Sequence, residues 1–203
     1  MPTKTAAANK SEKSPKSEKS AATNGASFSK ETYLRWFKEM VLMRRFEEKT
    51  GQLYTMQKFG GFCHLYIGQE AILAGMITAI RTSDRIITGY RDHCHPLVLG
   101  VPAKNVMAEL FGKITGTSKG KGGSMHYFDK QRNLFGGHGI VGGQIGLGAG
   151  IAFADKYRGE DHVTLCMMGD GAARQGILHE TFNMAMTWKL PVIFIIENNN
   201  YAM

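Results

Sequence analysis

The stretch VTLCMMGDGAARQGILHETFNMAMTWKLPVIFIIENNN, residues 163–200, decides the fold. It contains two continuous apolar runs, 163–168 and 192–196, which are typical of parallel strands buried on both faces. Between them, residues 172–189 have helical periodicity. A strand, a helix and a second strand in this order predict a right-handed parallel crossover. We therefore expect an α/β fold with a parallel sheet flanked by helices.

Polar residues follow both predicted strands. Asp170 lies in a GDG turn after the first strand, and Asn199 lies among three asparagines after the second. The loops that follow parallel strands share one edge of the sheet, where α/β proteins bind ligands. A carboxylate and an amide oxygen suit Mg²⁺ or Ca²⁺, and a glycine-flanked turn before a helix suits phosphate. The pair therefore predicts a divalent cation beside a diphosphate, and an ordinary turn with a polar loop is the alternative.

The remaining chain predicts more helices than strands. Apolar residues at helical spacing follow Ser29, a good N-cap, and predict an amphipathic helix over 30–57. We expect further helices over 68–80, 102–114 and 140–158, a short strand running into a polar loop within 84–100, and a glycine-rich loop over 116–139. Gly142, Gly146 and Gly150 share one face of the helix over 140–158, which predicts that another backbone packs closely there, from this chain or a partner.

Composition narrows the functional classes. Of 203 residues, 43% are hydrophobic, which is ordinary for a globular protein, and no run of about 18 apolar residues predicts a membrane span. The formal charge is +8, and six lysines against two glutamates place much of it within residues 1–30. The tail over 1–28 lacks large apolar residues, so we expect it to be disordered. A nucleic-acid-binding arm or a mitochondrial transit peptide is a weaker interpretation, and we expect neither nucleic-acid nor membrane partners.

Cysteine usage bears on the compartment. The chain has three cysteines, Cys63, Cys94 and Cys166, with no CxxC pair. An odd number without paired spacing fits a reducing cytoplasm better than a disulfide framework.

Six motifs occur in order along residues 29–203: MRRFEEK, GFCHLYIGQEA, GYRDH, GKGGSMH, GGHGIVGGQIGLGAG and the GDG-to-NN unit. In this order they resemble the alpha subunits of thiamine-diphosphate-dependent 2-oxo acid dehydrogenases, and most of all those that act on pyruvate. The resemblance implies that residues 29–203 form the N-terminal part of a thiamine-diphosphate-binding domain. It also implies that the chain ends before later elements of that domain.

The resemblance assigns cofactor contacts to particular residues. It implies that three oxygen donors bind a Mg²⁺ that bridges the diphosphate: the Asp170 carboxylate, the Asn199 side chain and the Tyr201 carbonyl. It implies diphosphate contacts from Tyr90, Arg91, Gly171 and Ala172, and aminopyrimidine contacts from the backbones of Gly139 and Val141. The chemistry suits these roles, because a guanidinium presents several donors to phosphate oxygens.

Histidines are the expected catalytic residues. His64 and His93 match family histidines on the substrate side, where an imidazole orients a carboxylate or moves a proton. A purely structural role is the alternative for each. The spacing of His93 and His95 also occurs in zinc sites, but no third or fourth ligand is evident. Ser124 and His126 are expected to order the loop over the cofactor.

The resemblance implies oxidative decarboxylation of pyruvate, with acetyl transfer to a lipoyl group on a partner acyltransferase. It also implies an α2β2 assembly in which the beta subunit supplies the glutamate that activates the aminopyrimidine. Related subunits acting on branched-chain 2-oxo acids or acetoin remain alternatives, as does a non-catalytic truncated remnant that binds partner subunits. A Mg²⁺-dependent phosphoryl-transfer enzyme is disfavoured because the sequence has no P-loop.

Overall fold

A parallel four-stranded sheet forms the centre of the computed structural model, which describes residues 28–202. The strands are β1 (Arg85–Gly89), β2 (Leu134–His138), β3 (Thr164–Gly169) and β4 (Val192–Glu197), in the order β2-β1-β3-β4. Each neighbouring pair is parallel. The expected α/β class is confirmed, and so is the pairing of the two strands from the stretch 163–200. The tail expected over 1–28 lies outside the described residues, except for Phe28.

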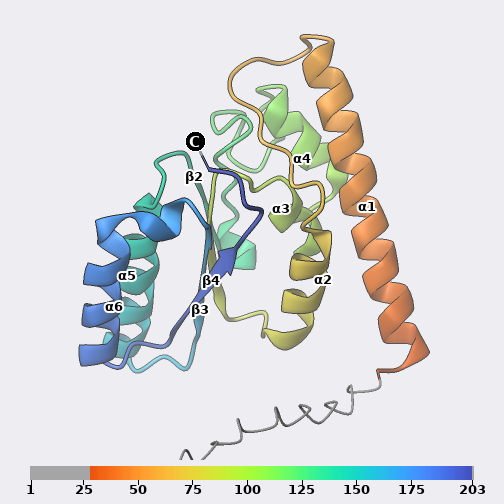
Figure 1. Cartoon of the computed structure of the whole chain (residues 1–203). Coiled ribbons are helices and arrows are strands. Elements are labelled where there is room, and N and C mark those ends of the chain that lie inside the picture. Colours follow the sequence, from red (N-terminus) through yellow and green to blue (C-terminus); the bar gives the residue numbers. More distant parts are fainter. Residues whose placement is uncertain (1–27, 203) are drawn as a thin grey trace, which may run out of the picture.

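Residues 28–202 contain six helices, which lie on both sides of the sheet (Figure 1). They are α1 (Lys30–Thr55), α2 (Glu70–Ala79), α3 (Cys94–Val98), α4 (Ala103–Leu110), α5 (Gly143–Arg158) and α6 (Gly176–Thr187). Figure 1 shows α5 and α6 on one side of the sheet and α1 to α4 on the other. As predicted, Ser29 caps α1, because its side chain accepts a hydrogen bond from the Thr32 amide at 3.2 Å. Within residues 28–202, no helix is long and apolar enough to cross a membrane.

Alternating side chains of β1 and β3 build two apolar layers, since successive residues of a strand point to opposite faces. One layer packs against α1 and α2 and includes Met43, Leu73, Ile86, Leu165 and Met167. The other packs against α5 and α6 and includes Ile87, Ile145, Cys166, Met168 and Leu178. β3 is therefore buried on both faces, as its continuous apolar run predicted.

The expectation that β4 is equally buried is wrong. Ile193 and Ile196 are 53% and 50% exposed. β4 pairs with β3 on one side only and lies at the edge of the sheet, so part of its apolar surface has no cover within the described chain.

The loop expected over 116–139 is also wrong in part, because it contains β2 and a short 3-10 turn, η1 (Lys130–Arg132). The β2 sequence LFGGH has two glycines and no apolar alternation, so it gives little strand signal. Close packing explains the glycines. A Cβ at Gly136 would lie 2.3 Å from the Phe128 ring, and one at Gly137 would lie 2.0 Å from Asp92 Oδ2.

Two predicted segments differ in detail. Residues 94–98 form α3 where a polar loop was expected, because the side chains from Cys94 to Leu97 are buried and pack as a helical turn. The helix expected over 172–189 is divided. A 3-10 turn, η2 (Ala172–Arg174), comes first, Gln175 is extended with ψ 142°, and α6 follows.

Within residues 28–202, the glycines of the predicted stripe do not meet another backbone, and Gly142 precedes α5 as its N-cap. A Cβ at Gly146 would have only ordinary contact with Ile177, at 3.7 Å, and one at Gly150 would have no described atom within 4 Å. The glycine that packs tightly is Gly148, whose added Cβ would lie 2.8 Å from Cys166 Sγ. Of the two predicted alternatives, residues 28–202 do not supply the close approach, and approach by a partner stays a prediction.

Candidate functional site

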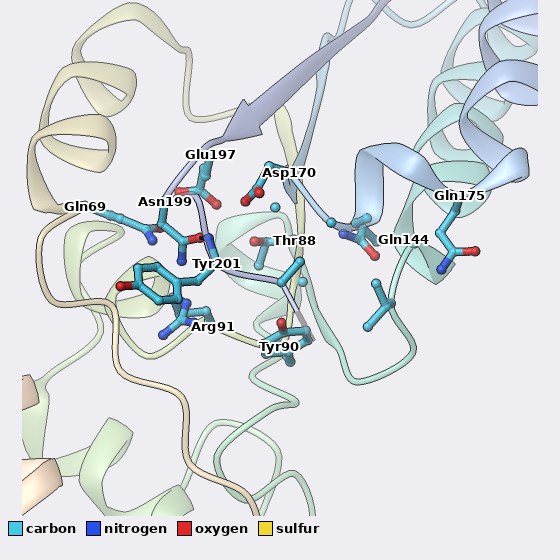
Figure 2. A pocket seen from close by; sticks show the side chains of 17 residues that line it. Gln69, Thr88, Tyr90, Arg91, Gln144, Asp170, Gln175, Glu197, Asn199 and Tyr201 are labelled. Carbon is cyan, nitrogen blue, oxygen red and sulfur yellow. Dashed lines mark hydrogen bonds between the residues drawn. The ribbon is translucent and has the colours of Figure 1, made fainter.

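A pocket lies at the carboxyl edge of the sheet, beyond the ends of β1, β3 and β4 (Figure 2). The chain crosses from β1 to β2 in one direction along the sheet and from β3 to β4 in the other, so β1 and β3 flank a topological switch point. Such points are where α/β sheets bind ligands. The cavity volume is about 190 Å³, below the roughly 300–1,000 Å³ of typical ligand pockets. A second cavity of about 350 Å³ adjoins it and shares Arg91, Glu197 and Asn199 with its lining.

Asp170 and Asn199 both line this pocket, as the spacing of GDG and the asparagines predicted. Asp170 directly follows β3, and its Oδ1 is buried without a hydrogen-bond partner among residues 28–202. Asn199 Oδ1 accepts a hydrogen bond from the Tyr201 amide at 2.9 Å, which closes a local turn. A buried carboxylate oxygen without a partner is costly, so this atom fits a bound cation or a donor from a ligand.

Most of the side chains that could act as metal ligands in this pocket are not carboxylates. No group of three or more His, Cys, Asp or Glu side chains that could hold a metal occurs in the described part of the chain. Two carboxylates, those of Asp170 and Glu197, line the pocket, so a metal at this edge would take its other ligands from amide and carbonyl oxygens, which Mg²⁺ and Ca²⁺ accept. Figure 2 shows Asp170, Glu197, Asn199 and Tyr201 around the same part of the pocket.

Gly171 and Ala172 continue the pocket lining after Asp170. A Cβ at Gly171 would lie 2.5 Å from the Cβ of Ala202, so only glycine fits beneath the last described residues. Ala172 is buried and begins η2. The N-terminal amides of α6 begin only at Gly176, so the helix terminus expected directly after GDG is a 3-10 turn instead.

Tyr90 and Arg91 follow β1 and line the pocket from the opposite side. The Arg91 guanidinium donates to the Leu65 carbonyl, which ties the end of β1 to the segment before α2. The His64 ring lies beside that of Tyr90, with centroids 4.5 Å apart at 52°. Burial, and then the positive charge of Arg91, lowers the pKa of His64. His64 is therefore favoured as a neutral imidazole next to the pocket lining.

The two residues expected at the aminopyrimidine are placed differently. Val141 lines the pocket, whereas Gly139 is not among the lining residues. Gly139 lies beside His126, since an added Cβ would be 3.4 Å from the imidazole Cε1. His126 Nδ1 donates to the Gly137 carbonyl at 3.0 Å, so this histidine does help to order the glycine-rich segment.

His93, like His64, is not among the residues that line the pocket. It is fully buried, with Nδ1 2.8 Å from Glu47 Oε2 and Nε2 2.6 Å from Ser124 Oγ. Both ring nitrogens are thus engaged within the protein. The neighbouring His95 is also buried, and burial lowers its pKa to about 3, so it is held neutral.

Sequence reasoning missed several residues that line the pocket, namely Gln69, Thr88, Gln144, Gln175 and Glu197. Gln144 Nε2 donates to the Met167 carbonyl at 3.1 Å, and its Oε1 is buried with no partner within residues 28–202. Glu197 accepts a hydrogen bond from the Tyr66 hydroxyl, and burial raises the pKa of Glu197. Two sequence features could have indicated these residues: Glu197 ends an apolar strand, and Gln144 lies at the start of a glycine-rich helix.

Comparison with known proteins gives the family. The sequence model described as "Dehydrogenase E1 component" matches residues 38–203. The chain belongs to the dehydrogenase E1 component family. This E1 chain is 62% identical over 178 residues to the pyruvate dehydrogenase E1 component subunit alpha of Rhizobium meliloti, a match that covers 88% of the chain and 51% of that relative.

Other relatives of the E1 chain carry the same description. The pyruvate dehydrogenase E1 component subunit alpha of Rickettsia felis is 56% identical over 86% of the chain and 53% of its own length. The mitochondrial subunit alpha-1 of Oryza sativa is 52% identical over 84% of the chain and 44% of its own length. The E1 chain thus spans about half the length of the relatives it matches.

Proposed function

We propose that the E1 chain is the cofactor-binding alpha subunit of a pyruvate dehydrogenase component. In this proposal it takes part in the oxidative decarboxylation of pyruvate, with acetyl transfer to a lipoyl group on a partner acyltransferase. The names of the relatives support pyruvate as substrate over branched-chain 2-oxo acids or acetoin, and they do not favour a non-catalytic remnant. The observation that carries the proposal is the buried, unpartnered Asp170 Oδ1 at the switch point of an E1-family sheet.

Three oxygen donors at this edge are proposed to hold Mg²⁺. They are the Asp170 carboxylate, the Asn199 side chain and the Tyr201 carbonyl, which belong to residues that line one pocket. The Asp170 Oδ1 atom supports the assignment, because it is buried and no hydrogen bond from the described chain offsets the cost of that burial. The small, oxygen-only donor set suits a hard cation that also takes oxygens from a phosphate.

Thiamine diphosphate is the proposed cofactor, and when bound it supplies the electron sink for decarboxylation. Its diphosphate would contact Tyr90, Arg91, Gly171 and Ala172, which all line the pocket. The Arg91 guanidinium carries the charge for this contact. The backbones of Gly139 and Val141 remain our proposal for the aminopyrimidine, and Gly139 requires a ligand that extends beyond the pocket lining.

His64 is the proposed catalytic residue of this chain on the substrate side. Its half-buried ring beside Tyr90, and a lowered pKa caused by burial and Arg91, support a neutral imidazole that donates to the substrate carboxylate or moves a proton. We do not extend direct contact with substrate to His93, because both of its ring nitrogens already have partners.

The proposed partners are a beta subunit in an α2β2 assembly and a lipoyl-bearing acyltransferase. Residues 29–203 are proposed to form the N-terminal part of the cofactor-binding domain, which is supported by the match of this chain to about half the length of its relatives. A cytoplasmic location stays a prediction. Its support is that Cys63, Cys94 and Cys166 are free thiols in the described chain.

The proposal is tested on the complete complex, stripped of cofactor and treated with EDTA. We expect pyruvate decarboxylation to return only when thiamine diphosphate and Mg²⁺ are both added. A branched-chain 2-oxo acid and acetoin serve as comparison substrates and should be turned over more slowly. Full activity in the stripped complex, or a preference for either comparison substrate, would contradict the proposal.

A further inference from the structure

Three buried side chains outside the pocket form a hydrogen-bonded chain, which we call the buried triad: Glu47, His93 and Ser124. Glu47 belongs to α1, His93 immediately precedes α3, and Ser124 lies in the glycine-rich segment between α4 and β2. His93 Nδ1 donates to Glu47 Oε2 at 2.8 Å, and His93 Nε2 is 2.6 Å from Ser124 Oγ. Glu47 and His93 are 0% exposed and Ser124 is 6% exposed. The triad therefore joins three distant segments in the interior.

Glu47 is held by further donors. Its Oε1 accepts from the Tyr66 amide at 2.9 Å and lies 3.6 Å from Cys94 Sγ, which donates to it. A buried carboxylate needs such complete hydrogen bonding to be tolerated. Burial opposes a charge on His93, but the Glu47 carboxylate beside it raises the pKa of the imidazole overall. The triad thus joins a buried carboxylate, an imidazole and a hydroxyl through hydrogen bonds, which fix the orientation of the imidazole.

The segments joined by the triad carry two residues of the proposed substrate side. Glu47 binds the backbone amide two residues after His64, and His93 lies three residues after Tyr90. The His64 and Tyr90 rings are 4.5 Å apart, and Tyr90 lines the pocket. Any displacement between α1 and the start of α3 would therefore change how these rings meet.

We propose that the buried triad positions His64 against Tyr90 for the 2-oxo acid substrate. This inference rests on the proposed function, and it makes Glu47, His93 and Ser124 positioning residues that act without touching substrate. A shift of about 1 Å in a group that orients substrate can cost about a hundredfold in rate, so loss of one triad contact should be measurable.

Substitutions at Ser124 and His93 remove single contacts of the buried triad and keep others. Ser124→Ala removes the oxygen that contacts the imidazole, whereas Ser124→Thr keeps a hydroxyl. His93→Asn keeps a donor towards Glu47 and loses the contact with Ser124. Glu48→Gln is the matched control, because Glu48 is the next residue of α1 but is exposed and paired with Arg45.

Two readouts are measured on the complete dehydrogenase. The first is kcat and KM for pyruvate, together with thiamine diphosphate affinity. The second is the alkylation rate of Cys63, followed by peptide mass spectrometry. Cys63 is half-buried one residue before His64; burial raises the pKa of its thiol, and a hydrogen bond with Ser124 opposes that rise.

We expect kcat to fall about tenfold or more in Ser124→Ala and His93→Asn, with cofactor affinity unchanged. Cys63 should be alkylated several times faster in His93→Asn, which keeps the Ser124 hydroxyl beside the thiol. Ser124→Thr should recover most of the rate, and Glu48→Gln should match wild type. Because Ser124→Ala removes only one hydroxyl, it keeps the test valid if His93→Asn does not fold.

Three results would overturn the inference. They are a kcat within about twofold of wild type in Ser124→Ala, an unchanged alkylation rate of Cys63 in His93→Asn, and a loss of rate that Ser124→Thr does not rescue. A wild-type complex without activity towards pyruvate would refute the proposed function instead. An active wild type with equally active triad variants would refute the role of the triad alone.

Discussion

Replacing Gly148 in α5 by alanine tests how closely this helix packs on the sheet. The added Cβ would lie 2.8 and 2.9 Å from Sγ and Cβ of Cys166 in β3, and 3.2 Å from Cγ2 of Ile87 in β1. These neighbours are the buried interior of two central strands, which cannot move away freely. Overpacking of this kind costs about 1–3 kcal/mol, whereas alanine gains about 1 kcal/mol over glycine in a helix. We expect Gly148→Ala to destabilise the fold by up to about 2 kcal/mol.

Gly150→Ala is the matched control in the same helix. Gly150 is exposed, and an added Cβ would have no described atom within 4 Å. Only the gain in helix propensity remains, so the free energy of unfolding should rise by about 0.5–1 kcal/mol. The two variants should therefore differ by about 1–3 kcal/mol, the cost of the clash alone.

Urea denaturation of the alpha subunit, followed by tryptophan fluorescence, measures this difference, provided that the free energy of unfolding falls with urea concentration at the same slope in both variants. Equal stability of the two variants, or a more stable Gly148→Ala, would refute the packing of α5 against β3 described above. The same pair measured in the complex with its partner subunit addresses the glycine stripe. Destabilisation by Gly150→Ala in the complex alone would support the predicted close approach of a partner backbone.

Two further predictions concern Asp92 and the isolated chain. Burial raises the pKa of Asp92 to about 8, so between about pH 4 and pH 8 the folded carboxyl keeps a proton that the unfolded one has lost. The stability that this proton contributes is present below about pH 4 and is lost as pH rises towards 8, at up to about 1.4 kcal/mol per pH unit. Asp92→Asn should remove this pH dependence of the free energy of unfolding. Urea denaturation from pH 5 to 8 measures it, and the same pH dependence in both proteins would contradict the prediction. Residues 1–203 expressed alone should be poorly soluble or oligomeric and bind thiamine diphosphate weakly, because β4 exposes apolar side chains at an unpaired edge. Light scattering and isothermal titration with Mg²⁺ decide this, and a monomer with tight cofactor binding would show that the expectation is wrong.

The parallel sheet and the meeting of Asp170 with Asn199 at one edge were predictable from sequence. Continuous apolar runs mark buried strands, and the single intervening helix leaves little choice of topology. The edge position of β4 was not predictable in the same way, since an apolar run does not tell how many neighbours a strand has. β2 was missed because its glycines are selected by close packing against Phe128 and Asp92, which leaves no strand pattern.

The buried triad was beyond local pattern reading. Glu47 and His93 are 46 residues apart in sequence, and His93 and Ser124 are 31 apart. One signal was present, because Glu47 lies on the face of α1 that also buries Met43 and Phe46. A carboxylate on an apolar face predicts a buried partner. It does not predict which residue supplies it, because that depends on how α1, α3 and the glycine-rich segment pack together.

The most direct test of the central claim is a titration of thiamine diphosphate into the EDTA-treated complete complex, with and without Mg²⁺. Wild type should bind tightly only with Mg²⁺, and Asp170→Ala should lose most of that affinity, because it removes the carboxylate proposed to hold the cation. Asp161→Ala is the control, since that side chain is 96% exposed on the surface, and it should bind like wild type. If Asp170→Ala binds the cofactor as tightly as wild type, and with the same response to Mg²⁺, the proposed site is wrong.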